Sequence, residues 1–232
     1  MIKVKNILPD KLYSSFLNTY NSLFTDYAIK TYSQEGEDLI LRKVFGRKNN
    51  GFYIDIGAHH PKRFSNTYYF YKKGWKGINI EARPGSKILF DKTRPRDINL
   101  EFAISSESKE LTYYMFNEPA LNGFSNQNVA NLKDNKEYKI IKEIKLTTQR
   151  LDSVLSNHLT PKQNIDFMSI DVEGMDFDVL ISNNWNLFKP SIIVIEDPDF
   201  DFKGGSKIFT FLESYKYKLF AKTFNTSFYR LS

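Results

Sequence analysis

The sequence predicts an α/β fold with a mostly parallel sheet. From residue 51 onward, short apolar runs alternate with helix-like segments, a pattern typical of βαβ units. Two of the runs, FMSID and SIIVIE, are almost continuously apolar, as expected for parallel strands that are buried on both faces. A length of 232 residues suits one domain with a full core and a small appendage.

The strands follow in order along the chain. We expect five parallel strands, at Phe52–Ile56, Gly77–Glu81, Leu100–Ser105, Phe167–Asp171 and Ile192–Glu196. A helix that begins at Ser206 comes next. Two strand-like runs, 218–223 and 227–231, then flank Asn225-Thr226, and this ending predicts an antiparallel pair at the C-terminal edge of the sheet.

Two regions lie outside this alternation. Residues 9–45 have helical patterning with a cap at Asp10, which predicts a helical N-terminal extension over the ligand-binding ends of the strands. Residues 106–150 read as an insertion with an extra β-ribbon, and loops of that length are usually functional or disordered. We therefore expect an extension at residues 1–50 and one domain at 51–232 that contains the insertion.

The composition limits the partners and the compartment. No apolar run approaches the roughly 20 residues that span a bilayer, and the first residues lack the apolar stretch of a signal peptide, so we expect a cytoplasmic protein without a membrane span. The chain has no cysteine, which leaves oxygen and imidazole ligands for any metal. Its net charge of +6 favours acidic partners, although a solvated lysine-rich face is the simpler explanation.

The turn after the first strand is the candidate ligand site. In a parallel α/β sheet, ligands bind beyond the carboxyl ends of the strands, where Asp55, Gly57 and Ala58 lie. A dinucleotide would require G-x-G-x-x-G, but the second and third glycines of this motif are absent and His59 replaces the second. The turn is therefore poorly suited to bind a pyrophosphate, and a ligand with a single adenosine and a cationic or zwitterionic tail fits better.

A second candidate ligand residue, Glu81, ends the second strand, 26 positions after Asp55. A carboxylate at this strand end can accept hydrogen bonds from both hydroxyls of a ribose, and the alternative is an ion pair with a nearby cation such as Arg83. An adenosine with free ribose hydroxyls and no diphosphate points to S-adenosylmethionine as the cofactor.

Several ordered motifs carry a resemblance to a known family. They are SQEGEDLIL, GFYIDIGAHHPKRFSNTYYFYKKGWKGINIEA, RPRDINLEFAIS, PALNGFS and IDFMSIDVEGMDFDVL. Together, from about Ser33 to Glu196, they resemble the FkbM-type S-adenosylmethionine-dependent methyltransferases. The resemblance implies a Rossmann-like fold of the class I methyltransferases.

The same resemblance implies which residues hold the cofactor. Asp55, Gly57 and Ala58 would hold its methionine end and sugar, and Glu81, with Ala82 beside it, would bind the ribose. Ala103 and Ile104 would flank the adenine. The methionine carboxylate or the acceptor would be approached by Gln34, Ser65 and Asn66.

Carboxylates gather where the chemistry is expected. The fourth strand ends with Asp171 and is followed by Glu173, and the fifth ends with Glu196-Asp197. These parallel strand ends are neighbours, so the acids can converge on the transferred methyl group, and Asp171, Glu196 and Asp197 could hold Mg²⁺ or another hard divalent ion. Metal-dependent macrolide-sugar O-methyltransferases look similar, but the acids could equally bind the cofactor amine, cap helices or pair with lysines.

A base is needed if the acceptor is a hydroxyl group, because the alcohol must lose its proton. His59 and His60 follow the cofactor turn, and we favour His60 over His59, although a neutral histidine bonded to backbone is the more common role for either. Glu173 is the rival base, with Asp171 beside it.

The expected function is methyl transfer to a hydroxyl of a sugar or nucleotide-activated sugar, in the biosynthesis of surface glycans such as capsule or lipopolysaccharide, or of natural products. A loop with Asn122, Phe124 and Ser125 could close over the acceptor. Candidate contacts for phosphates of the acceptor are Lys62, Arg63, Arg94 and Arg96.

Other functions stay open at this stage. A non-sugar acceptor, or a non-catalytic glycan-binding role, would share the same motifs. A nucleic-acid acceptor is disfavoured because no dense Arg/Lys stripe alternates with aromatic residues, and the missing glycines oppose a nicotinamide enzyme. The sequence leaves the oligomeric state open.

Overall fold

The computed structural model describes residues 9–132, 135, 137–160 and 163–232, which form two units. The first unit, Met1–Thr31, contains helix α2 (Asp10–Tyr20) and a π-helical turn, η1 (Asn21–Thr25). Residues 1–8 of the expected extension lie outside the described part of the chain. The second unit, Tyr32–Ser232, contains everything else.

The division between the units falls after Thr31, whereas the sequence pattern suggested residue 50. Helix α3 (Glu37–Phe45) belongs to the second unit because its Leu41 is fully buried in a core cluster with Tyr53 and Phe70. The amphipathic pattern that predicted this helix was correct, but its apolar face packs into the domain.

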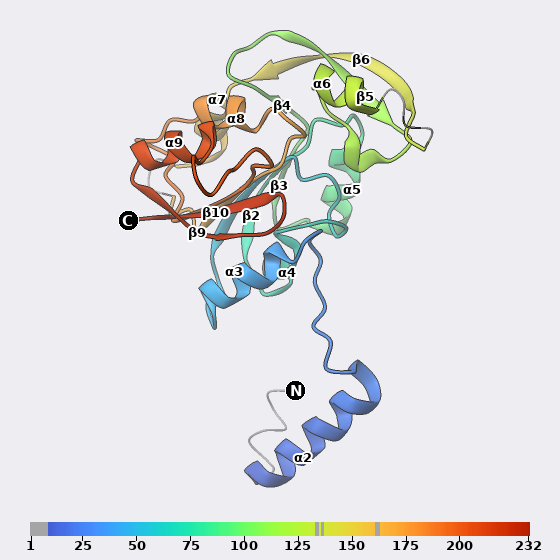
Figure 1. Cartoon of the computed structure of the whole chain (residues 1–232), viewed down its shortest axis with the longest axis vertical. Helices are drawn as coiled ribbons and strands as arrows, with labels where there is room; N and C mark the ends of the chain where they lie inside the picture. The colour runs from blue at the N-terminus through green and yellow to red at the C-terminus, as the bar shows by residue number, and fades with distance from the viewer. Residues whose placement is uncertain (1–8, 133–134, 136, 161–162) are drawn as a thin grey trace. The chain divides into compact units, whose positions relative to one another are not determined.

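The main sheet has seven strands. In spatial order they are β3 (Ile98–Leu100), β2 (Lys76–Ile80), β1 (Phe52–Ile56), β7 (Phe167–Ile170), β8 (Ile192–Glu196), β10 (Thr226–Leu231) and β9 (Tyr217–Lys222). The first five are parallel, and β10 and β9 are antiparallel to their neighbours. Figure 1 shows β10 and β9 in red near the C-terminus. This confirms the predicted class of fold and the antiparallel C-terminal edge.

Helices cover both faces of this sheet. Alternate residues along β1 point to opposite sides: Ile54 and Ile56 join one core cluster and Tyr53 joins the other. The first cluster packs under α7 (Leu151–His158), α8 (Asp176–Ile181) and α9 (Lys207–Ser214), and the second under α3 and α4 (Tyr68–Lys72). Among the described helices, which also include α5 (Ser86–Thr93), none is long and apolar enough to cross a membrane.

A smaller three-stranded sheet includes the predicted insertion at residues 106–150 and a short strand that precedes it. It consists of β4 (Ala103–Ile104), β6 (Ile140–Gln149) and β5 (Glu110–Phe116), with η2 (Pro119–Leu121) and α6 (Asn126–Leu132) between β5 and β6. The extra β-ribbon is thus present as β5 and β6.

One predicted strand, Leu100–Ser105, is wrong as a single element. Leu100 ends β3, and Ala103 pairs instead with Thr148 of the smaller sheet. Between them the Glu101 carboxylate accepts hydrogen bonds from the backbone N–H groups of Gly85 (2.8 Å) and Lys87 (3.2 Å). Because of this bend, β3 and β4 pair in two different sheets. An apolar run does not specify its pairing partner, so the sequence could not show that the run is divided.

Candidate active site

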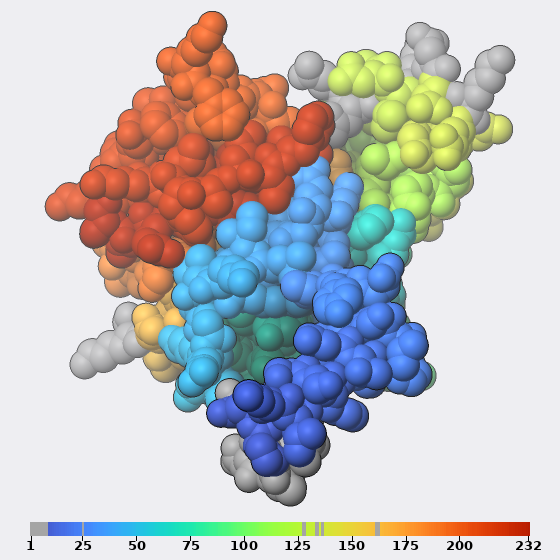
Figure 2. Space-filling view, turned by 60° about the horizontal axis from the view of Figure 1, so that its bottom comes forward, coloured from blue at the N-terminus to red at the C-terminus, as the bar shows by residue number. Residues whose placement is uncertain are grey.

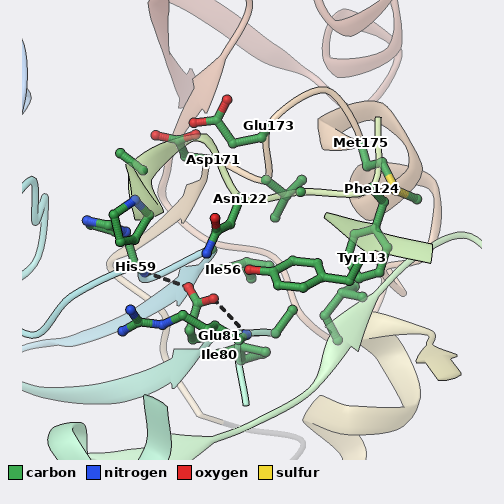
Figure 3. A pocket seen from close by; sticks show the side chains of 18 of the residues that line it. Ile56, His59, Ile80, Glu81, Tyr113, Asn122, Phe124, Asp171, Glu173 and Met175 are labelled. Carbon is green, nitrogen blue, oxygen red and sulfur yellow. Dashed lines mark hydrogen bonds between the residues drawn. The ribbon is translucent and has the colours of Figure 1, made fainter. Parts of the chain in front are cut away.

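A cavity of about 780 Å³, its open mouth included, lies at the carboxyl ends of β1, β2 and β7 (Figure 3). Loops of the smaller sheet supply the other wall. The lining residues that matter below are Gln34, Gly57, His59, Phe64, Glu81, Ala82, Arg83, Phe102, Ile104, Tyr113, Asn122, Phe124, Asp171, Glu173 and Met175.

Gly57 lines the cavity and packs against the backbone at the end of β7. Its φ is +76°, and a Cβ atom placed there would lie 1.7 Å from the backbone oxygen of Asp171. The N–H groups of Gly57 and Ala58 both bond the carbonyl of Ile80, at 3.0 and 3.1 Å. Gly57 therefore allows two strand ends to pack closely, whereas Ala58 is buried and does not line the cavity.

Glu81 lies in the cavity with its carboxylate held in place. The carboxylate accepts hydrogen bonds from the N–H groups of His59 (2.7 Å) and Arg83 (2.9 Å), and dashed lines at Glu81 mark hydrogen bonds in Figure 3. Burial raises the pKa of Glu81, and the two N–H groups oppose that rise. A carboxylate has about four acceptor positions, so about two remain for ligand hydroxyls.

His59 is the histidine that lines the cavity. Its backbone is left-handed (φ +51°), and its ring stacks on Phe64 with 6.1 Å between centroids. Its Nε2 atom is buried and has no hydrogen-bond partner among the described residues. Burial, followed by the charges of Arg63 and Arg83, lowers the pKa of His59 to about 4, so the ring is neutral at pH 7.

His60, which we favoured as the base, is placed elsewhere. It does not line the cavity, and its Nδ1 atom accepts hydrogen bonds from the N–H groups of Lys62 and Arg63, both at 3.0 Å. Its role in the structure is to cap the turn. Sequence order alone could not separate the two histidines, because the left-handed backbone at His59 decides which ring faces the cavity.

Asp171 and Glu173 lie together on the cavity wall opposite Glu81 (Figure 3). Asp176 holds the loop between them, accepting hydrogen bonds from the N–H groups of Val172 and Gly174 at 3.1 Å each. Burial, and then the neighbouring Glu196, raises the pKa of Asp171. Burial, and then Asp171, raises the pKa of Glu173 to about 8.

These raised pKa values predict a pH dependence of stability. A carboxyl group with a raised pKa in the folded state stabilises the fold below its unfolded pKa, and this contribution is lost as the pH rises through the folded pKa. For Glu173 the loss falls between about pH 4.5 and pH 8. Glu173→Gln should therefore reduce the fall in unfolding free energy between pH 5 and pH 8.5 by a few kcal/mol, as measured by urea denaturation. An unchanged slope would contradict the burial of an ionisable Glu173.

The predicted metal ligands are not gathered into a site. The Asp197 carboxylate accepts hydrogen bonds from the hydroxyls of Ser206 (2.7 Å) and Tyr229 (3.4 Å). In the described part of the chain, no group of three or more acidic or histidine side chains is arranged to hold a metal ion. The described residues therefore do not bring Asp171, Glu196 and Asp197 together as one metal site, and the Asp197 carboxylate instead bonds Ser206, the residue at the N-terminal end of α9.

Several predicted cofactor residues lie outside the cavity lining. Asp55 is buried and accepts a hydrogen bond from Thr67 (2.6 Å), and Asn66 donates to Ser169 (3.0 Å). Ser65 is buried, as is Ala103, whereas the neighbouring Ile104 reaches the cavity. The structure therefore brings together Gln34, Gly57, Glu81, Ala82, Ile104, Asp171 and Glu173 from the predicted set.

Two of the proposed phosphate contacts are also elsewhere. Arg94 is fully buried, and its guanidinium donates to the Pro61 carbonyl (2.6 and 2.8 Å) and to Ser65 (2.7 Å). Arg96 stacks over Tyr71 with 4.0 Å to the ring centroid. Arg63 pairs with Glu118 of the insertion at 3.0 Å, which places it near the cavity wall that Phe64 and Pro119 form.

Some lining residues were not predicted. Tyr113 of β5 is almost fully buried, and burial, followed by the nearby Glu81, raises its pKa. Figure 3 shows its ring between Ile56 and Phe124. The run ELTYYMF indicated a strand, but no sequence signal shows that this strand crosses the ligand site of another sheet.

Comparisons with known proteins identify the family of the chain. No curated protein matches the chain. A solved TehB-like SAM-dependent methyltransferase from Corynebacterium glutamicum is similar at 10% identity and a TM-score of 0.39, covering 96% of this chain and 97% of that one. The FkbM methyltransferase domain matches residues 55–219, more than two thirds of the chain. The chain therefore belongs to the FkbM methyltransferase family, whose cofactor is S-adenosylmethionine.

Proposed function

We propose that this protein transfers a methyl group from S-adenosylmethionine to a hydroxyl group of a sugar, free or nucleotide-activated, in the synthesis of a surface glycan or a natural product. The observation that carries the proposal is that a single cavity joins Glu81, at the end of β2, to Asp171 and Glu173, at the end of β7. The first is suited to a ribose and the others to a reacting hydroxyl group.

The residues that line the cavity support binding of the adenosine of the cofactor. About two acceptor positions of the Glu81 carboxylate remain for the ribose hydroxyls, and Ile80, Phe102 and Ile104 offer an apolar wall for the adenine. Gln34 is the polar residue of the N-terminal segment that we assign to the methionine end. When bound, the cofactor supplies an electrophilic methyl group on a sulfonium.

Glu173 is our candidate for the general base. It lines the cavity, and a pKa of about 8 lies close to a neutral working pH, where a base is most effective. His59 is the second residue for the hydroxyl group, because its buried Nε2 has no partner in the described residues. A hydroxyl can donate to or accept from this nitrogen, so either tautomer of the neutral ring holds it.

The walls next to these residues suit a sugar. Asn122 and Gln34 are neutral polar residues, and Phe64 and Phe124 offer aromatic faces on which a sugar ring can stack. Arg83 lines the cavity, and Arg63 lies at its edge, so both guanidinium groups are candidates to bind a phosphate of a nucleotide-activated sugar. Lys62 is a further candidate for a contact with such a phosphate.

The test is a screen of nucleotide sugars and free sugars with S-adenosylmethionine, read by mass for a gain of one methyl group. With an acceptor in hand, Glu173→Gln should lower kcat by roughly 100-fold or more, with little change in cofactor affinity. Glu81→Gln should instead weaken cofactor binding by about tenfold or more, measured by calorimetry. Glu143→Gln, an exposed carboxylate of β6, is the matched control and should change neither.

Two results would contradict the proposal. If the wild-type chain does not bind S-adenosylmethionine, the remaining alternative is a non-catalytic glycan-binding role. A methylated product that carries its new group on nitrogen, as shown by fragmentation, would retain the methyltransferase and remove the hydroxyl acceptor.

A further inference from the structure

The excess of basic over acidic residues in this chain is concentrated in one stretch. Residues 42–76 contain nine lysines and arginines and a single acidic residue, Asp55, which is buried. The net charge of this stretch, +8, exceeds the +6 of the whole chain. A uniform solvated surface would spread the excess, so this concentration requires a structural explanation.

Most of these cations converge on one surface of the second unit. Arg42 of α3 and Lys73 after α4 both lie over the ring of Tyr69, at 3.8 and 5.8 Å from its centroid. Lys48 lies 5.7 Å from the ring of Trp75, which donates a hydrogen bond to the Lys48 carbonyl. The ends of α3 and α4 and the start of β2 therefore form one patch. We call the following residues the basic face: Arg42, Lys43, Arg47, Lys48, Lys72, Lys73, Lys76 and Arg96.

The basic face has little internal compensation. Within the described residues, Arg42 pairs with Asp38 and Lys48 pairs with Asp166, but no ion pair involves Lys43, Arg47, Lys73, Lys76 or Arg96. Apart from Arg42, all members are exposed. Part of this surface, the light-blue residues that include α3, is in view in Figure 2. An array of exposed, uncompensated cations attracts an anionic surface.

The basic face lies away from the cavity. Lys48 precedes β1 and Lys76 begins β2, whereas the cavity lies at the other ends of these strands, at Gly57 and Glu81. The cations therefore do not serve the proposed cofactor or acceptor, and a partner on this surface leaves the cavity accessible.

The first unit has an exposed apolar stripe. Leu12, Phe16, Tyr20, Leu23 and Phe24 recur at helical spacing along α2 and η1, and all are exposed. Phe16, Tyr20 and Phe24 contact one another in series, with 6.3 and 5.2 Å between ring centroids. A helical segment of 16 residues is marginal alone in water, so this stripe requires a partner.

The chain enters the second unit beside the basic face. Tyr32, the first residue of that unit, accepts a hydrogen bond on its hydroxyl from Lys72 (2.9 Å), and the Lys72 ammonium lies 5.2 Å from its ring centroid. The segment that carries the stripe is therefore joined along the chain to a residue that contacts the basic face.

We propose that the basic face and the stripe of α2 and η1 bind the surface of an anionic lipid bilayer. An aromatic helix that enters the interface and a set of basic residues that meets the headgroups are the two signals that together produce stable peripheral attachment. One chemistry explains both features, whereas a nucleic acid would explain the cations and leave the stripe exposed. This inference does not depend on the proposed acceptor.

The test is flotation of the full chain with vesicles of phosphatidylcholine alone or mixed with phosphatidylserine. We expect binding to the mixed vesicles that weakens as salt is raised. Each basic residue near such a surface contributes about fivefold in affinity, so Lys73→Glu with Lys76→Glu should weaken binding by roughly 25-fold or more. The matched control, Lys142→Glu with Lys218→Glu, makes the same charge change at exposed positions of β6 and β9 and should stay within about twofold.

The stripe is tested separately by Phe16→Ser, which should weaken vesicle binding at constant charge. Cofactor affinity, measured by calorimetry, should be unchanged in all of these variants, which shows that they are folded. Failure of the wild-type chain to bind mixed vesicles would overturn the proposal, as would an equal loss in the control pair. So would two other results: binding of RNA that depends on Lys73 and Lys76 without vesicle binding, or a dimer that Phe16→Ser dissociates while vesicle binding persists.

Discussion

Gly57→Ala is expected to unfold the chain or to remove its cofactor site. The new methyl group would lie 1.7 Å from the backbone oxygen of Asp171, and no rotation of a side chain can relieve a contact with backbone. The left-handed φ of +76° adds about 1–2 kcal/mol for any residue with a Cβ atom. We expect a loss of roughly 4 kcal/mol or more in the free energy of unfolding, which is rare for a single substitution.

Gly85→Ala is the matched control. Its φ is +83°, almost the same as that of Gly57, but a Cβ atom there would meet nothing within 4 Å. Urea denaturation of the two variants separates the cost of the backbone conformation, about 1–2 kcal/mol, from the cost of the collision. Equal losses in the two variants would show that β1 and β7 do not approach each other as closely as described.

Arg94→Met should also destabilise the chain strongly. The fully buried Arg94 guanidinium makes five hydrogen bonds, to Pro61, Ser65, Thr67 and Asn79, and has Asp97 4.0 Å away. Removing one partner of such a buried network leaves groups without compensation and costs about 3–5 kcal/mol. Thermal or urea denaturation measures this loss directly.

The neighbouring Arg96→Met is the control for Arg94→Met. Arg96 is exposed and donates one hydrogen bond, to the Tyr71 carbonyl (2.6 Å), so its loss should cost about 1 kcal/mol. A small effect of Arg94→Met, similar to that of Arg96→Met, would contradict the role of Arg94 as a structural clamp.

Arg94 explains how the turn after β1 is held without the usual glycines. Two residues of this turn, His59 and Phe64, are left-handed although neither is glycine, with φ of +51° and +53°. A conformation of this kind persists only where its surroundings enforce it. Arg94 binds the Pro61 carbonyl between these two residues and Ser65 directly after Phe64, and the Glu81 carboxylate accepts the His59 N–H. The turn beside the proposed cofactor site therefore depends on a residue some 30 positions away in sequence.

The sequence by itself determined the sheet and part of the site. Continuous apolar runs identify buried strands such as β7 and β8, and the residues at their carboxyl ends face a common edge because parallel strands end together. Glu81, Gly57, Asp171 and Glu173 could therefore be predicted to lie near one another, and the order of the motifs indicated the family.

Tertiary structure alone decided which of the remaining candidates face the cavity. His59 lines it and His60 caps a turn because of a left-handed φ, which pattern does not encode. Arg94 is buried and Asp197 is turned toward Ser206 because their hydrogen-bond partners lie on other segments of the chain. Local pattern specifies the elements and the positions at their ends. The direction of a polar side chain depends on hydrogen-bond partners that only the packed chain brings together.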